Sequence, residues 1–78
     1  MSVPVMEEPN LKERVEARAA TRLRESSYLG LRQVRCTFRD GVLTLAGQVS
    51  SYFLRQMARA LVHDLDGVQA IDDQLVVK

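Results

Sequence analysis

Three arginines near the start of the chain recur at intervals of four residues: Arg14, Arg18 and Arg22. Residues four apart lie on one face of an α-helix, so this spacing predicts a row of positive charge that could bind phosphate or carboxylate groups. Two interpretations stay open. The row is either a patch for anionic lipid headgroups or a solvated face balanced by Glu16, Glu25 or the acidic C-terminal strand, and a solvated face is the commoner case.

Charge is distributed unevenly along the 78 residues, although the formal net charge is only +1. Residues 14–39 contain seven arginines and two glutamates, a balance of +5, whereas residues 60–78 contain four aspartates and one lysine, a balance of −3. A molecule polarised in this way can steer an anionic partner toward its basic side. The net charge by itself indicates neither a nucleic-acid nor a membrane partner.

Two aromatic-aliphatic pairs, Tyr28-Leu29 and Tyr52-Phe53, stand where the first predicted helix ends and the second begins. Such side chains either enter the headgroup layer of a membrane, where amphipathic rings are favoured, or close the ends of the core. We expect Tyr28 at the edge of the core, and Phe53 is the best candidate for exposure because it lies off the apolar stripe of its helix. The predicted lipid-binding residues are therefore Arg14, Arg18, Arg22, Tyr52 and Phe53.

The residues that most often perform catalysis do not form a recognisable site. Cys36 lies on the apolar side of a predicted strand, where a small core residue is expected. His63, beside Asp64 on the polar side of a predicted helix, is expected to be exposed, and one histidine with one cysteine makes a zinc site improbable. Asp72 and Asp73 are neighbours in a strand and point to opposite faces. We predict no enzyme and no cofactor, and without a GxxG loop or an aromatic pair on the sheet we expect no nucleic-acid partner.

The first predicted helix runs from Leu11 to Glu25. Asn10 is a suitable N-cap, with the acidic Glu13 in the first turn. Apolar residues then recur every four positions up to Leu23, which indicates one buried stripe. Residues 1–9 have two prolines and no periodicity, so we expect a flexible tail, followed by a single domain over residues 10–78.

A β-hairpin is predicted around Asp40-Gly41, since a type I′ turn needs positive φ at both positions. Residues that face each other across this turn have numbers that sum to 81. The apolar pairs are then Phe38–Leu43, Cys36–Leu45 and Val34–Gly47, and the mostly polar pairs are Arg39–Val42, Thr37–Thr44, Arg35–Ala46 and Gln33–Gln48. Gly47 falls on the apolar face, where we expect it to allow a helix to approach the sheet closely.

A second amphipathic helix follows Ser50 or Ser51, with Gly67 as its C-cap after Asp66. Its apolar stripe comprises Leu54, Met57, Ala58, Leu61, Val62 and Leu65. Residues 68–77 form a closing strand, in which we expect a bend near Asp72-Asp73 because Asp73 interrupts the apolar parity. The order α-β-β-α-β predicts an α+β fold, a three-stranded sheet with two helices packed on one face.

This layout resembles the BON domain, a small module found in bacterial osmotic-stress and nodulation proteins. The resemblance covers about residues 10–78, and its most specific parts are the glycine in Leu45-x-Gly47-x-Val49 and the pair Gly67-Val68 after an amphipathic helix. The family usually has Asn where this chain has Asp73. The other matching residues are Val34, Cys36, Phe38, Asp40, Gly41, Val42, Leu43, Thr44, Ala58, Leu61, Val62, Ile71, Leu75 and Val77.

The resemblance implies a non-enzymatic module for lipid or surface attachment, because BON domains are proposed to bind phospholipid. Anionic phospholipid headgroups are therefore the expected partner. The alternative is a protein partner or a second copy, bound through the open sheet face or an edge strand. No signal peptide or membrane-spanning run is evident and there is one cysteine, so we expect the chain in the cytoplasm, either dissolved or peripheral to a membrane.

Overall fold

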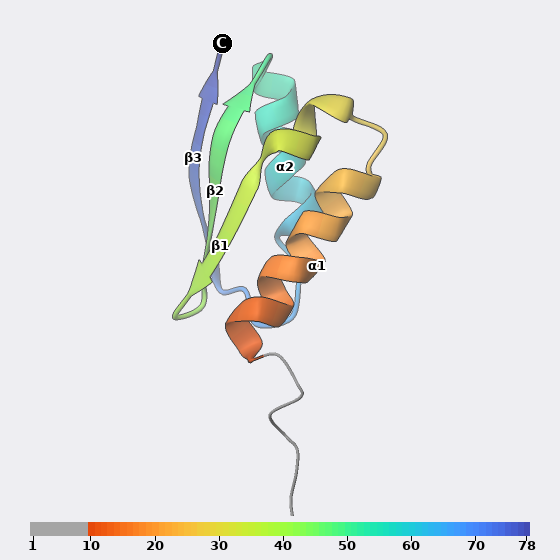
Figure 1. Ribbon diagram of the computed structural model, residues 1–78. Coiled ribbons are helices and arrows are strands. Elements are labelled where there is room, and N and C mark those ends of the chain that lie inside the picture. Colours follow the sequence, from red (N-terminus) through yellow and green to blue (C-terminus); the bar gives the residue numbers. More distant parts are fainter. Residues whose placement is uncertain (1–9) are drawn as a thin grey trace, which may run out of the picture.

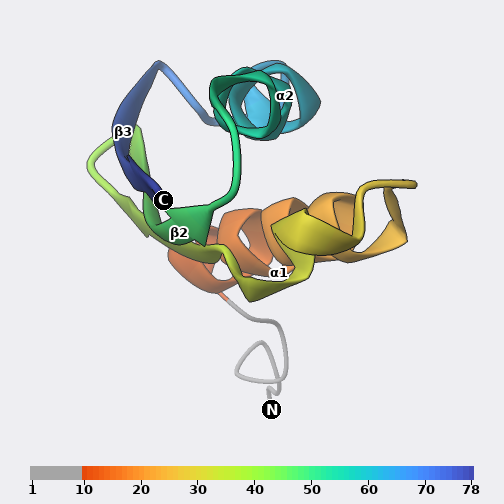
Figure 2. The ribbon, with the colours of Figure 1, turned by 90° about the horizontal axis from the view of Figure 1, so that it is seen from above.

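The computed structural model describes residues 10–78, and the predicted tail over residues 1–9 lies outside this range. The chain folds into a three-stranded sheet with both helices on one side of it, as predicted (Figures 1 and 2). The elements are α1 (Leu11–Glu25), the short 3-10 helix η2 (Leu29–Gln33), β1 (Arg35–Arg39), β2 (Val42–Val49), α2 (Tyr52–Val62) and β3 (Ala70–Val77).

The sheet has the order β1-β2-β3 and mixes both strand orientations. β1 and β2 are antiparallel, and their five pairs, from Arg35–Ala46 to Arg39–Val42, have the predicted register. The turn also has the predicted conformation, with φ of 50° at Asp40 and 84° at Gly41. β3 lies parallel to β2, because α2 carries the chain back along the sheet before β3 begins.

The core lies between the sheet and the two helices. Asn10 begins α1 as predicted, since its Oδ1 accepts a hydrogen bond of 2.9 Å from the backbone N–H of Glu13. Ser51, rather than Ser50, begins α2 by accepting a bond of 3.2 Å from Leu54 N–H. The buried apolar residues are Val15, Ala19, Leu23, Leu31, Val34, Phe38, Leu43, Leu45, Val49, Ala58, Val62, Leu65 and Leu75.

Two predicted boundaries after Ser51 are wrong: the end of the second helix, and the start of the closing strand, which is Ala70 rather than residue 68. The helix α2 ends at Val62, one turn before the predicted C-cap at Gly67, because tight turns replace the last helical turn. In these turns Leu65 N–H binds Val62 C=O and Val68 N–H binds Leu65 C=O. This path still buries Leu65, and Gly67, with φ of 95°, turns the chain toward β3.

The predicted role of Gly47 is also wrong. An added Cβ would lie 3.2 Å from the carbonyl oxygen of Gln33 and 3.6 Å from Cα of Val34, so the close neighbours are the last residue of η2 and the residue that follows it, not α1 or α2. Val34 does lie beside Gly47, although it precedes the first residue of β1. Because φ of Gly47 is 127°, glycine is needed here for its backbone conformation as well as for space.

Candidate functional site

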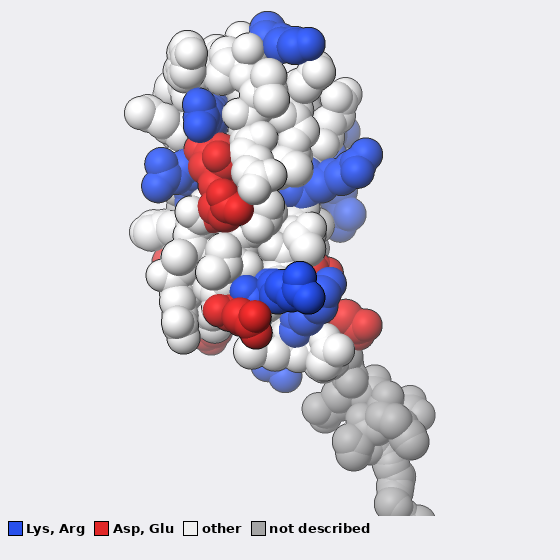
Figure 3. Space-filling model, turned by 90° about the vertical axis from the view of Figure 1, so that its left-hand side faces the viewer, with Lys and Arg blue, Asp and Glu red and all other residues white. Residues whose placement is uncertain are grey.

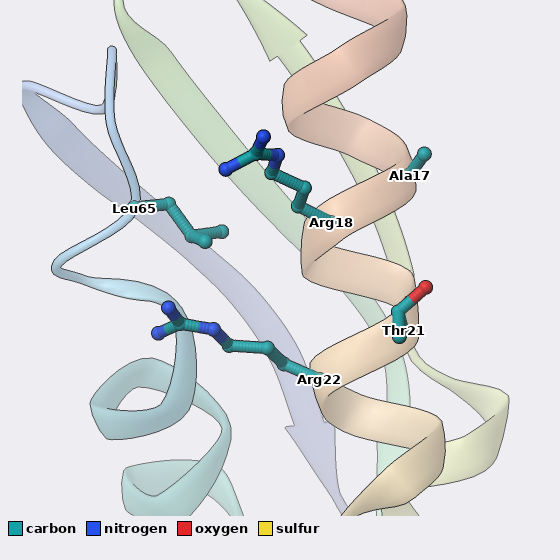
Figure 4. Close-up of a pocket in the computed structure, with 5 residues that line it drawn as sticks. All are labelled: Ala17, Arg18, Thr21, Arg22 and Leu65. Atoms are coloured by element: carbon teal, nitrogen blue, oxygen red, sulfur yellow. The ribbon is translucent and has the colours of Figure 1, made fainter.

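The arginine row of α1 faces the connection between α2 and β3. Figure 4 shows Arg18 and Arg22 extending from α1 toward this connection, with Leu65 pointing back between them. These three residues line an open hollow. Arg14 and Arg18 line the neighbouring hollow together with Asp66, so the row lies beside acidic residues of the connection.

Arg22 is engaged within the molecule. Its Nη1 donates to Oδ1 of Asp64 at 2.5 Å and to the carbonyl oxygen of Leu61 at 3.1 Å. The hydrogen bond and charge of Arg22 lower the pKa of the Asp64 carboxyl group. Among residues 10–78, neither Arg14 nor Arg18 forms an ion pair, and both are exposed. Arg22 therefore joins α1 to the end of α2, and Arg14 and Arg18 are the members of the row that can meet a ligand.

The opposite end of the molecule carries large apolar side chains in solvent. Leu29 and Tyr52 are each 69% exposed and Phe53 is 55% exposed. We call these three residues the apolar tip. They come from η2 and the first turn of α2, which lie together at the top of Figure 1. Tyr28 packs against the core as predicted, and its ring meets that of Phe53 edge to face at 5.7 Å between centroids.

The five predicted lipid-binding residues do not form one surface. Arg22 contacts Leu61, which follows Tyr52 by nine residues along α2 and so lies about 13 Å farther along the helix axis. The fold thus provides two separate surfaces, the arginine row and the apolar tip. Arg32 is exposed on η2, three residues after Leu29 and so on the same side of this 3-10 helix. It supplies a positive charge at the tip that the four-residue spacing of the arginine row does not indicate.

A second ion pair fixes α2 to β3. Nε of Arg55 donates to Oδ2 of Asp73 at 2.9 Å, and Oδ1 of Asp73 accepts from Leu75 N–H at 3.1 Å. The predicted bend at Asp72-Asp73 is wrong, because β3 pairs with β2 without interruption from Ala70 to Val77. Asp73 stays on the inner face because Arg55 meets it there. The sequence does show that Asp73 alternates in step with the apolar residues of its strand, which places it on the inner face. Only the tertiary structure identifies Arg55 as its partner.

The edge of β1 is bound by a carboxylate from α1. Oε2 of Glu16 accepts from Phe38 N–H at 2.7 Å and also from Nζ of Lys12 at 2.7 Å. These two hydrogen bonds, with Lys12 the larger influence, lower the pKa of Glu16. Glu16 is therefore a structural residue of the sheet rather than a partner of the arginine row.

The remaining candidates occupy ordinary structural positions. Cys36 packs against the core, and burial raises the pKa of its thiol to about 11, so little thiolate is present at neutral pH. His63 is exposed as expected. Within residues 10–78, no three histidine, cysteine, aspartate or glutamate side chains gather closely enough to hold a metal ion. None of the helices in the described part of the chain has the length and apolar character needed to cross a membrane.

The open face of the sheet carries a mixture of side chains. Figure 3 views this side and shows mostly uncharged surface, on which acidic and basic groups lie next to one another in several small clusters. Val76 is the large apolar residue exposed on this face, at 47%. Basic residues thus form no continuous patch here, so the sheet is a weaker candidate for anion binding than the arginine row.

Comparison with known proteins identifies the family. The model of the BON domain matches residues 12–78, which is nearly the whole chain. BON domains are a family of non-catalytic, binding-type domains, and phospholipid binding has been proposed for the family. A search of curated proteins found no match.

Proposed function

Because the chain belongs to the BON domain family, we propose that it is a non-catalytic module that attaches to anionic phospholipid surfaces. The observation that carries this proposal is the apolar tip, where three large apolar side chains are more than half exposed at one end of a small domain. Keeping such side chains in water is unfavourable, and insertion into the headgroup layer would remove them from it.

The basic residues supply the preference for anionic lipid. Arg32 adjoins the apolar tip, and Arg14 and Arg18 extend the positive charge along α1. Each arginine near a charged bilayer contributes about 1 kcal/mol. Tyr52 has a ring that suits the membrane interface. Arg22 contributes less to this attraction because Asp64 neutralises it.

Co-sedimentation with vesicles tests the proposal. The protein is mixed with vesicles of phosphatidylcholine alone and with vesicles that also contain phosphatidylglycerol, at low and high salt. We expect binding to the anionic vesicles that weakens with salt. The double variant Leu29→Ser/Tyr52→Ser should bind at least about tenfold more weakly, since it removes two exposed apolar side chains.

Matched variants separate the two surfaces. Arg14→Gln/Arg18→Gln should also weaken binding by about tenfold, whereas Arg35→Gln/Arg39→Gln changes the same charge on the open sheet face and should have a smaller effect. Val76→Ser is the apolar control on that face. Equal affinity for both vesicle types, or no binding to either, would contradict the proposal. A loss confined to the arginine variant would assign attachment to α1 and not to the tip.

A further inference from the structure

The outer edge of β3 presents backbone groups that the sheet does not use. At the two ends of β3, Ala70 N–H binds Gly41 C=O and Lys78 N–H binds Val49 C=O. Even-numbered residues therefore point their backbone groups at β2, and odd-numbered residues point theirs outward, because the direction alternates along a strand. Among residues 10–78, the outward N–H groups of Ile71 and Asp73 have no hydrogen-bond acceptor.

A hollow adjoins this edge on its inner side. It lies between α2 and the start of β3 and is lined by Gln56, Arg59, Ala60, His63 and Ile71. The α2 residues in this set are spaced by three and four, so they form one helical face. Ala60 has a small side chain, which leaves room there. A strand paired with β3 would direct alternate side chains into this hollow.

The hollow is basic, and the carboxylates around it are already bound. Asp73 pairs with Arg55 and Asp64 pairs with Arg22. Asp72 lies on the open face, where it accepts from the side chain of Gln74. Arg59 forms no ion pair among residues 10–78. A ligand with a carboxylate would therefore complement the charge of the hollow, with Arg59 as its partner and His63 nearby.

We propose that the β3 edge and this hollow together bind an extended peptide strand that carries an acidic side chain. The peptide backbone pairs with Ile71 and Asp73, and its acidic side chain enters the hollow toward Arg59. Pairing stops at Leu75, whose outward N–H is already bound by Asp73. The site is thus a short one, and it is separate from both the apolar tip and the arginine row of the proposed lipid contact.

Selection from a random octapeptide library displayed on phage tests this site on the whole protein. We expect enriched peptides with one fixed acidic position. In nuclear magnetic resonance titrations, their synthetic forms should shift the amide signals of Ile71, Asp73 and the last turn of α2. Arg59→Glu should weaken binding at least about tenfold, and Ile71→Pro, which removes an outward N–H, should also weaken it.

Arg39→Glu makes the same charge reversal on β1, the opposite edge strand. Its affinity for the selected peptides should stay within about twofold of that of the wild type. Arg59 is exposed, so Arg59→Glu keeps the test valid even if Ile71→Pro fails to fold. The proposal is overturned if no peptide is enriched, if Arg59→Glu has no effect, or if the shifts map to β1 or the apolar tip. Shifts at Ile71 and Asp73 that depend on protein concentration without peptide would instead assign the edge to a second copy. Vesicle binding is not involved, so failure here leaves the lipid proposal intact.

Discussion

The two outer strands of the sheet are secured in different ways. β1 has contacts on both sides of its backbone. On one side, Gly47 of β2 leaves room for residues 33–34, which lead into β1, and on the other, Glu16 of α1 accepts a hydrogen bond from the outward N–H of Phe38. β3 pairs with β2 over its whole length, but its contact with α2 includes one partly exposed ion pair, Arg55–Asp73. Within the described range of 10–78, its outward N–H groups at Ile71 and Asp73 have no hydrogen-bond acceptor.

This difference indicates where the molecule can meet a partner. An unpaired strand edge is a template for another strand, and proteins commonly cover or charge such edges. Among residues 10–78, α1 packs against β1 and its Glu16 binds the outward N–H of Phe38, whereas on the longer β3 Asp73 binds Leu75 N–H and leaves the N–H groups of Ile71 and Asp73 without an acceptor. The β1 side is therefore built for stability and the β3 side retains capacity for binding. Four substitutions test how the helices and the two outer strands are held.

Gly47→Val should have the largest effect. A β-branched residue at φ of 127° is strained, and its Cβ would crowd the carbonyl oxygen of Gln33 at 3.2 Å. We expect a loss of about 3 kcal/mol in the free energy of unfolding, enough to lower Tm by more than about 10 °C. Thermal unfolding by circular dichroism measures this, with Ala46→Val as the control on the adjacent position. A melting curve like that of the wild type would refute the proposed need for glycine.

Asp73→Ala should loosen the β3 side. It leaves Arg55 without its carboxylate and Leu75 N–H without its acceptor, for an expected cost of about 1 kcal/mol. Asp73→Asn keeps an acceptor for Leu75 and should cost less. Urea denaturation of both variants, combined with Arg55→Gln in a double-mutant cycle, gives the coupling energy. Zero coupling would show that the pair does not secure β3.

Glu16→Gln should lower the free energy of unfolding by about 0.5 kcal/mol, because a neutral acceptor replaces the charged one that binds Phe38 N–H at the β1 edge. The folded protein has the lower pKa for Glu16, so this stabilisation is complete at neutral pH and is lost as the pH falls below about 4. Urea denaturation between pH 3 and 7 should show that the free energy of unfolding falls less steeply with decreasing pH in Glu16→Gln than in the wild type. Hydrogen exchange should also be faster at Phe38 in the variant, approaching the rate at Ile71, and an unchanged rate would count against the carboxylate cap.

Asp64→Asn should have the smallest effect. The pair with Arg22 is exposed on both sides, and such pairs contribute little to stability in water. Urea midpoints of wild type and variant should agree within error, while binding to phosphatidylglycerol vesicles should increase because Arg22 loses its counter-charge. A clear loss of stability would mean that the Arg22–Asp64 ion pair, rather than core packing, holds α1 against α2.

The local features of this fold could be predicted from sequence because neighbouring residues determine them. The Asp40-Gly41 turn fixes the register of β1 and β2, and Asn10 and Ser51 provide side chains that begin the helices. The end of α2 could not be predicted in this way. Its apolar stripe continues to Leu65, and a tight turn buries Leu65 as well as another helical turn would.

The same distinction between local and long-range features applies to the candidate surfaces. The sequence was sufficient to identify the family and the α+β fold and to single out the arginine row and the two aromatic-aliphatic pairs. The three-dimensional arrangement was needed to show that Arg22 is bound by Asp64, that the arginine row and the apolar tip lie apart, and that Asp73 meets Arg55. These outcomes depend on residues far apart in the chain, whose partners are set by how the helices lie on the sheet. A periodic pattern specifies which face a residue occupies, but not what stands opposite it.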